Sequence, residues 1–195
     1  GSWANDVAVL RVNESFHLDG VMVAPICLSP LKSHPTGPVI VAGWGRTKEK
    51  HPRQPHQLHF TVLQPMSDSR CKQRFPYAFS PVEMFCAYGS SGRDTCHGDS
   101  GGAAAEFIGG SFFLRGLVSW GAGCARPHTP GVYTKIAPHY FEWIRETVVQ
   151  LGSPGDVAQL RVGSEQTPLP PASIKRTAKP NASVYCYPTA VCSFE

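Results

Sequence analysis

Residues 94–102 read DTCHGDSGG, a run in which a serine stands between an aspartate and two glycines. A serine hydroxyl becomes a useful nucleophile only when a base takes its proton and N–H donors face the oxyanion that forms on attack. The glycines allow the backbone to bend so that the N–H groups of Gly98 and Ser100 can point at one oxygen. The same residues also suit a plain glycine-rich turn, so the choice between the two depends on the rest of the chain.

The composition is that of a globular domain. The 195 residues are 42% apolar and 16% charged, which is enough for one hydrophobic core. The formal net charge of +4 is spread over isolated lysines and arginines, and this argues against nucleic-acid binding. No run of eighteen apolar residues occurs, and residues 1–12 lack the layout of a signal peptide. We therefore expect no membrane span and no targeting segment in this chain.

Seven cysteines are scattered along the chain, without a CxxC pair or a neighbouring histidine that would complete a zinc site. They are Cys27, Cys71, Cys86, Cys96, Cys124, Cys186 and Cys192. This spacing favours a disulfide framework in an oxidising compartment. Glycosylation triplets at Asn13 and Asn181 are compatible with secretion. Because the count is odd, at least one thiol is free or pairs outside the chain.

Short apolar runs separated by Gly, Pro and Ser predict an all-β region over residues 5–146. The clearest runs are residues 6–12, 38–44, 59–64 and 112–120. One helix is predicted to begin at Pro138 and to stop at Gly152, because apolar residues recur there at helical spacing. These residues are Tyr140, Trp143, Ile144 and Val148.

The composition changes at about Ser153, where prolines become frequent and large apolar residues become few. A segment of this kind buries too little apolar surface to fold alone. We therefore predict that residues 1–152 form the folded part of the chain and that residues 153–195 form a flexible C-terminal extension.

The order of seven motifs resembles that of the trypsin-like, chymotrypsin-fold serine endopeptidases. The motifs are NDVAVL at 5–10, GWG at 43–45, MFCA at 84–87, DTCHGDSGG at 94–102, LVSWGAGCA at 117–125, PGVYTKI at 130–136 and FEWI at 141–144. The resemblance implies an all-β fold of two six-stranded antiparallel barrels. This chain would represent the second barrel, the end of the first barrel and the C-terminal helix.

The resemblance also implies catalytic roles. Ser100 would be the nucleophile, and Asp6, 94 residues earlier, would orient a histidine and stabilise its imidazolium form. The N–H groups of Gly98 and Ser100 would form the oxyanion hole. Asp99 is similar to the aspartate that binds a freshly cut N-terminal amine when a zymogen is activated. Taken alone, Asp6 would be interpreted as a turn carboxylate, and only its register with Ser100 favours catalysis.

The specificity pocket follows from the same register. Asp94 matches the acid at the pocket floor, and Gly121 and Gly131 match the wall positions where a side chain would obstruct a long residue. Ser119, Trp120 and Gly121 match the strand that pairs with the substrate backbone. A carboxylate in an open, partly desolvated slot favours Arg or Lys. The resemblance therefore implies cleavage after these residues in protein or peptide substrates, and protein inhibitors as further binding partners.

The resemblance implies a disulfide pattern as well. Cys27 is similar to a residue that tethers the catalytic domain to an upstream propeptide or light chain. Another cystine of the family would join positions that Val39 and Glu106 occupy here, so that both of its cysteines are absent together. Register with the family pairs Cys71 with Cys86 and Cys96 with Cys124. Cys186 and Cys192, which lie beyond the family domain, would then be left to pair with each other.

The general base is the largest departure from the family pattern. The family order is histidine, aspartate, serine, but only five residues precede Asp6, and all eight histidines follow it. His97 lies on the same turn as Ser100, and we expect it to shape the cleft rather than act as the base. We therefore expect the chain to be the C-terminal portion of a secreted zymogen whose upstream part holds the histidine and the activation site. This portion alone is expected to be inactive.

Two functions remain open at this point. The first is a secreted endopeptidase that uses no metal and no organic cofactor. The second is a catalytically inactive homologue that binds partners through the same fold. It remains open because no histidine of this chain matches the general base of the family. The retention of Ser100, Asp6, Asp94 and Asp99 favours the enzyme.

Overall fold

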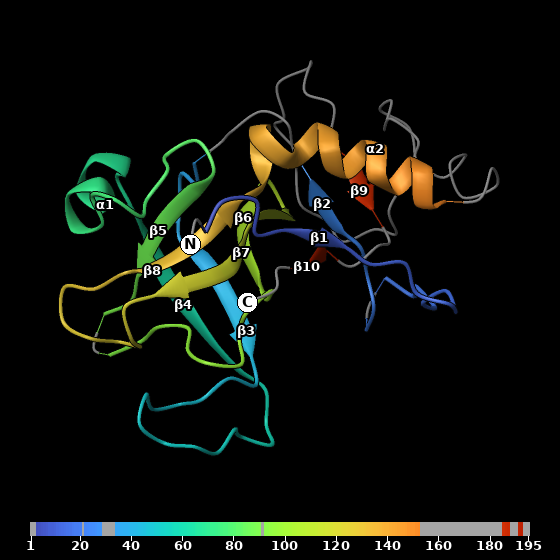
Figure 1. The fold of residues 1–195 in the computed structure, drawn as a ribbon. Coiled ribbons are helices and arrows are strands. Elements are labelled where there is room, and N and C mark those ends of the chain that lie inside the picture. Colours follow the sequence, from blue (N-terminus) through green and yellow to red (C-terminus); the bar gives the residue numbers. More distant parts are fainter. Residues whose placement is uncertain are drawn as a thin grey trace.

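The computed structural model describes residues 3–20, 22–28, 34–90, 92–152, 185–187 and 191–192. Its elements are β1 (Ala8–Val9), β2 (Ile26–Leu28), β3 (Val39–Gly43), β4 (His59–Met66), α1 (Asp68–Arg74), β5 (Met84–Tyr88), β6 (Ala103–Ile108), β7 (Ser111–Gly121), β8 (Gly131–Lys135), η1 (Ile136–Tyr140), α2 (Phe141–Leu151), β9 (Tyr185–Tyr187) and β10 (Val191–Cys192). Figure 1 shows their arrangement.

Six strands form a closed antiparallel barrel in the order β6-β3-β4-β5-β8-β7, and the pairing of β6 with β7 closes the ring. Outside the ring, β2 pairs in parallel with β7, and β9 pairs with the other edge of β2 (Figure 1). Strands β1 and β10 form a separate pair. The predicted all-β fold is confirmed. Most of the extension predicted for residues 153–195 lies outside the described residues.

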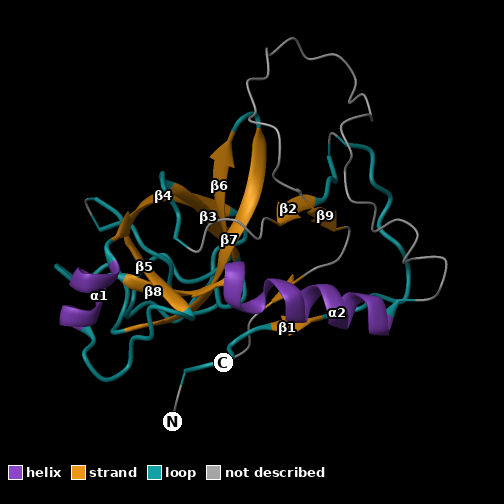
Figure 2. Ribbon diagram, turned by 90° about the horizontal axis from the view of Figure 1, so that it is seen from above, coloured by secondary structure: helices purple, strands orange, loops and turns teal. Residues whose placement is uncertain are grey.

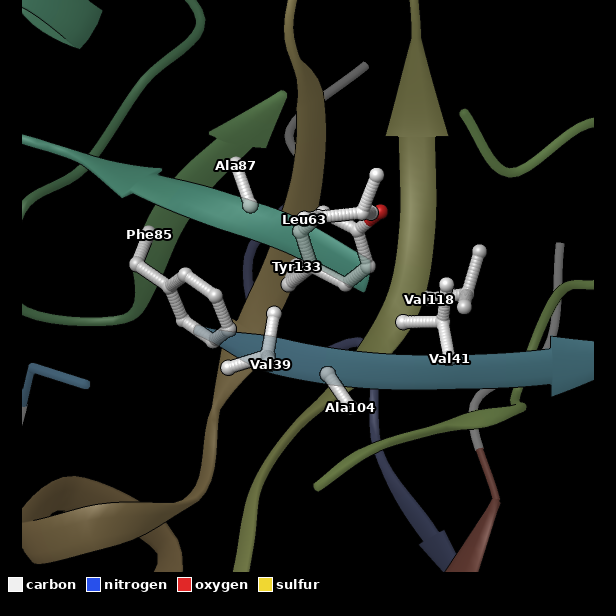
Figure 3. Packing of buried hydrophobic residues seen from close by; sticks show 8 residues of the cluster. All are labelled: Val39, Val41, Leu63, Phe85, Ala87, Ala104, Val118 and Tyr133. Carbon is white, nitrogen blue, oxygen red and sulfur yellow. The ribbon is translucent and has the colours of Figure 1, made fainter. Parts of the chain in front are cut away.

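The barrel interior is filled by side chains that alternate along the strands, as expected for a small closed barrel. Phe85 and Tyr133 stack with ring centroids 5.2 Å apart. Gly116 makes room for this stack, because a Cβ there would lie 2.5 Å from the Phe85 ring. Figure 3 shows the cluster, which consists of Val39, Val41, Leu63, Phe85, Ala87, Ala104, Val118 and Tyr133.

The helix at the end of the folded region packs on the side of the barrel that carries β2 and β7 (Figure 2). It begins with the π-turn η1, which contains Pro138, and continues as α2 up to Gly152. Tyr140 and Ile144 are buried as predicted, whereas Trp143 is 42% exposed and lies off the buried face. In the described residues, no helix is long and apolar enough to cross a membrane.

The helix α1 was not predicted from the sequence. It packs against the barrel through Cys71, which is fully buried and disulfide-bonded to Cys86 on β5. A second disulfide joins Cys96 to Cys124. Both pairs are the ones that the family resemblance implies.

Cys27 differs from the expectation. The resemblance reserves it for an upstream propeptide or light chain, but in the structure Cys27 is disulfide-bonded within the chain. The sheet brings the two ends of the chain together at this point, because Cys27 on β2 lies directly opposite Cys186 on β9. The structure therefore does not show the expected bond from Cys27 to an upstream propeptide or light chain.

A buried polar network occupies the place of the missing family cystine. Val39 and Glu106 are Cα partners in the pairing of β3 with β6. The Glu106 carboxylate lies 2.9 Å from the Nε of Arg115, and both side chains are only 3% exposed. Glu106 also accepts hydrogen bonds from the N–H groups of Thr36 and Gly37. An ion pair with backbone donors thus connects β3, β6 and β7 where a covalent bond is absent.

Replacing Glu106 by glutamine is expected to lower the free energy of unfolding by about 3–5 kcal/mol, because Arg115 would stay buried without its counter-charge. Urea unfolding measures this change. The matched control is Glu142→Gln, which breaks the exposed Glu142–Arg145 pair on α2 and should cost less than about 1 kcal/mol. Equal losses in the two variants would contradict the proposed role of the buried pair.

Candidate active site

The Ser100 turn is bound to strand β7 by backbone hydrogen bonds. The N–H of Gly101 donates to the carbonyl of Val118 at 2.9 Å, and the N–H of Val118 donates to the carbonyl of Gly102 at the same distance. Gly98 and Gly101 have φ angles of +95° and +79°, which favour glycine. The N–H groups of Gly98 and Ser100 have no acceptor among the described residues, so they are available to a ligand oxygen.

Asp6 is held beside this turn by contacts from the far end of the sequence. Its Oδ2 accepts a 2.5 Å hydrogen bond from Ser119 Oγ, and its carbonyl accepts one from Thr134 Oγ1 at 2.9 Å. The preceding Asn5 has a φ of +59° and donates its N–H to the Tyr140 hydroxyl. Burial raises the pKa of Tyr140 to about 12, so this hydroxyl keeps its proton. The sheet and the helix together therefore fix the turn that presents Asp6.

Asp6 and Ser100 thus reach the same short stretch of β7. Ser119, which binds the Asp6 carboxylate, directly follows Val118, which binds the Ser100 turn. Strand β7 therefore binds both Asp6 and the Ser100 turn through neighbouring residues, although the two are far apart in sequence. His97 is exposed at the edge of this turn, where its carbonyl accepts a hydrogen bond from the Arg46 N–H.

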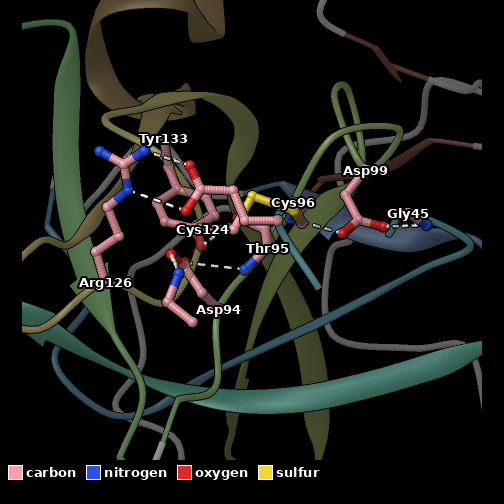
Figure 4. Close-up of a disulfide and its surroundings, with 10 residues drawn as sticks. Gly45, Asp94, Thr95, Cys96, Asp99, Cys124, Arg126 and Tyr133 are labelled. Atoms are coloured by element: carbon pink, nitrogen blue, oxygen red, sulfur yellow. Dashed lines mark hydrogen bonds and ion pairs between the residues drawn. A yellow bond between two sulfur atoms is a disulfide. The ribbon is translucent and has the colours of Figure 1, made fainter. Parts of the chain in front are cut away.

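Asp94 has a partly buried carboxylate that is bound by backbone donors. Its Oδ1 accepts the N–H of Thr95 at 2.9 Å, and its Oδ2 accepts the N–H of Ala125 at 2.8 Å (Figure 4). Burial is the largest influence on this group and raises its pKa to about 6, against the lowering effect of the two N–H groups. Asp94 is therefore ionised at neutral pH and lacks a counter-charge among its hydrogen-bond partners.

Glycines leave space beside this carboxylate. A Cβ on Gly131 would lie 3.1 Å from Asp94 Oδ1, so any side chain at that position would crowd the acid. A Cβ on Gly121 would lie 3.3 Å from the carbonyl of Gly123 and 3.9 Å from the Cα of Gly131. Gly131 therefore adjoins both Asp94 and Gly121, and the role of the three residues as walls and floor of a specificity pocket stays a prediction from the family resemblance.

The Asp99 carboxylate lies among backbone N–H groups. Its carboxylate accepts the N–H of Gly45 at 2.8 Å and the N–H of Cys96 at 2.9 Å (Figure 4). A Cβ on Gly43 or Gly45 would overlap the Asp99 carboxylate, which explains why the GWG motif has glycines there. The structure thus leaves Asp99 as an acid held by neutral donors in the described part of the chain.

A cavity of about 350 Å³ connects the two carboxylates. It is bordered by Asp94 and Asp99, by residues 41–49 and by residues 59–61. Figure 4 shows the Cys96–Cys124 disulfide between the two acids. Ser119, Trp120 and Gly121, the residues assigned to substrate pairing, do not line this cavity. Among the described residues, no three His, Cys, Asp or Glu side chains form a metal-binding group.

Two aromatic residues that contact Trp120, namely Trp3 and Phe75, were not predicted from the sequence. Trp120 stacks on Trp3 with centroids 6.0 Å apart and meets the edge of Phe75 at 4.9 Å. Trp3 comes from the segment before Asp6, and Phe75 follows α1, so three distant segments form one apolar surface. No periodic pattern in the sequence relates these three positions. The only signal was that Trp3 and Trp120 lie close in sequence to motifs of the family.

Comparison with known proteins agrees with this geometry. A family model described as Trypsin matches residues 1–144. Trypsin-1 of Astacus astacus is 41% identical over 147 residues, which cover 74% of this chain and 60% of that protein. Testisin of Homo sapiens is 39% identical over 138 residues, which cover 67% of this chain and 44% of that protein. Neuropsin, a serine protease expressed in the limbic system of mouse brain, superimposes with a TM-score of 0.60 at 32% identity, over 71% of this chain and 59% of its own.

The barrel, the C-terminal helix and the motif register define a chymotrypsin-fold serine protease domain. The chain belongs to the trypsin family, since the family model covers most of its length. It spans 60% or less of the length of each of the three relatives named here.

Proposed function

We propose that this chain supplies the nucleophile, the triad aspartate and the specificity pocket of an extracellular serine endopeptidase that cleaves after arginine or lysine. The observation that carries the proposal is the Asp94 carboxylate. It is partly buried, its hydrogen-bond partners are two backbone N–H groups, and Gly131 adjoins it without a side chain. A substrate guanidinium or ammonium would supply the missing counter-charge.

The proposed chemistry is acyl transfer in two halves. The Ser100 Oγ attacks the carbonyl carbon of the substrate, and a histidine takes the serine proton. The oxygen becomes an anion that the N–H groups of Gly98 and Ser100 stabilise. The histidine then gives the proton to the leaving amine as the C–N bond breaks. Water then attacks the acyl carbon while the same histidine takes its proton, and the histidine returns that proton to Ser100 Oγ as the ester bond breaks and the acid leaves. We place this histidine on a segment outside the 195 residues, where Asp6 would orient its ring.

The hydrogen bond from Ser119 to Asp6 supports this assignment. A triad aspartate must stay ionised and fixed so that it stabilises the imidazolium. The Ser119 hydroxyl donates to Asp6 Oδ2 and fixes the carboxylate, and the Thr134 hydroxyl donates to the Asp6 carbonyl and holds its backbone. Asp6 thus has the support that an orienting carboxylate needs.

We propose that Asp99 pairs with an α-amine released by proteolytic activation. The cavity beside Asp99 would receive a chain terminus, and an amine there would neutralise a carboxylate that now has only neutral donors.

The complete fold would also give a role to three exposed apolar residues, Leu10, Phe16 and Met22, which are 43%, 52% and 84% exposed. They would pack against the first barrel of the complete fold.

An extracellular location follows from the chemistry of the cysteines. Disulfides persist in oxidising compartments, and the structure forms them at Cys71, Cys96 and their partners. Asn13 lies in an exposed segment, as a glycosylation site requires, whereas Asn181 lies outside the described residues.

The test is to offer the full-length, proteolytically activated protein a peptide library that varies at the residue before the scissile bond. We expect peptides with Arg or Lys before the scissile bond to be cleaved faster than peptides with any other residue there. Binding of peptides without any cleavage would instead support an inactive homologue, and cleavage after large apolar residues would assign the pocket differently.

Affinity for a cationic pocket ligand is expected to rise with pH. Asp94 has a pKa of about 6, so it is mostly protonated at pH 5 and mostly ionised at pH 7. Its ionised fraction, and with it the affinity for benzamidine, should increase about tenfold across this range. Calorimetric titration of the full-length protein measures this. Benzyl alcohol, which is neutral, serves as the control ligand, and an equal pH dependence for both ligands would contradict the assignment to Asp94.

A further inference from the structure

A second hollow, of about 590 Å³, lies at the α1 end of the molecule, away from α2 (Figures 1 and 2). Its walls come from α1 and the end of β4, from residues 88–89 and 92–94, and from residues 125–130. None of the residues assigned to the triad or to the oxyanion hole lines it. We call this hollow the arginine groove, after the four arginines in its walls: Arg70, Arg74, Arg93 and Arg126.

The arginine groove concentrates the positive charge of the protein. Its walls carry four arginines and one carboxylate, that of Asp94, and Arg126 also pairs with Glu49, so the formal charge of the groove together with Glu49 is +2. Such a field attracts anions to the hollow more strongly than the net charge alone would suggest. Because these arginines are isolated in the sequence, the sequence alone does not predict that they cluster.

Two of the guanidinium groups are already held in place. Arg126 forms a two-pronged ion pair with Glu49 at the rim. Arg74 donates to the carbonyl of His128 at 3.3 Å and to Thr129 Oγ1 at 3.1 Å, and thereby joins α1 to the opposite wall. These contacts keep the walls together without cancelling the charge of Arg74.

The other two guanidinium groups have no acceptor among the residues that the structure describes. Arg70 and Arg93 are both exposed, and neither forms an ion pair or hydrogen bond there. Arg70 also lies four residues before Arg74 on the same helix face, where like charges destabilise a helix by a few tenths of a kcal/mol. A ligand that brings oxyanions would offset this repulsion and use donors that are otherwise only solvated.

We propose that the arginine groove binds a sulfated polysaccharide. Guanidinium groups bind tetrahedral oxyanions through paired N–H donors, and donors on three separate wall segments require a ligand that carries several such groups. Tyr88 is the one Phe, Tyr or Trp side chain among the described residues that line the groove, so stacking platforms for nucleobases are scarce. The disulfides place the domain in the oxidising compartment where sulfated sugars occur.

The test measures binding and needs no catalytic turnover, so its failure is distinguishable from failure of the proposed protease activity. A fluorescein-labelled heparin octasaccharide is titrated with the full-length protein at several NaCl concentrations. In the Arg70→Gln/Arg93→Gln variant we expect at least tenfold weaker binding. The slope of log Kd against log[NaCl] should fall by about two, because two charge contacts and their counterions are lost.

Two double variants remove the same number of charges elsewhere. Arg11→Gln/Arg145→Gln changes arginines in and beside α2, at the other end of the molecule, and Lys175→Gln/Arg176→Gln changes the basic cluster near the C-terminus. The proposal expects both variants to bind the octasaccharide within about twofold of the unmodified protein. It also expects weak binding of a hyaluronan octasaccharide, which carries carboxylates but no sulfo groups.

Three results would overturn the proposal. One is loss of binding in the Lys175/Arg176 variant with retention in the Arg70/Arg93 variant. Another is equal affinity for the hyaluronan octasaccharide. The third is equal affinity for a single-stranded oligonucleotide with the same number of charges. That result would mean that the groove binds any polyanion and does not select sulfated sugars.

Discussion

Ser100→Ala is expected to lower kcat on an arginyl peptide substrate by about a million-fold in the full-length protein. The variant removes the nucleophile, so the acyl-enzyme cannot form, and loss of one triad member removes most of the rate enhancement that the triad provides. KM should change little, because the Asp94 pocket is untouched. Hydrolysis of a fluorogenic Arg-amide measures both constants.

The matched control is Ser111→Ala, in a serine at the β6–β7 hairpin that has no assigned role. It should change kcat by less than about twofold. If Ser100→Ala retained a substantial part of the activity, the hydroxyl of Ser100 would not be the group that attacks the substrate.

Asp94→Ser is expected to reduce kcat/KM on Arg substrates by about two to four decades. The variant removes the counter-charge from a partly desolvated contact, which costs on the order of 3–5 kcal/mol in the transition state. A substrate with a small apolar residue at the same position should lose far less, since it makes no charge contact with the pocket floor.

A second variant separates specificity from assembly of the site. Asp99→Asn should depress cleavage of both substrate types alike, because Asp99 is assigned to the activation ion pair and not to the side-chain pocket. Equal losses on Arg and apolar substrates in Asp94→Ser would mean that Asp94 supports the fold instead of selecting the substrate.

The barrel was predictable because apolar runs in the sequence predict its strands. The site residues were assigned from the order of the motifs, through the family resemblance. The hydrogen bond from Ser119 to Asp6 could not be predicted from spacing, since it links residues 113 positions apart in sequence. Only the resemblance placed Ser119 in the site.

Other features escaped prediction for identifiable physical reasons. Glu106 was recognised as the replacement of a cysteine, but not as half of a buried ion pair. Its spacing of two from the buried Ala104 does indicate an inward side chain. Arg115, its partner, comes from the next strand, and charge pairs of this kind depend on packing rather than on pattern. The arginine groove is likewise a product of three segments that meet only in the fold.

Covalent labelling tests the central claim most directly. Full-length, activated protein is incubated with an aryl phosphonate that carries a guanidine-bearing side chain, and in parallel with one that carries a phenyl side chain. Peptide mapping by mass spectrometry then locates the adduct. We predict stoichiometric modification of Ser100 by the guanidine reagent, at a rate far above that of the phenyl reagent. In Asp94→Ser the rate of modification by the guanidine reagent should fall. An unmodified Ser100, or an adduct on another residue, would contradict it.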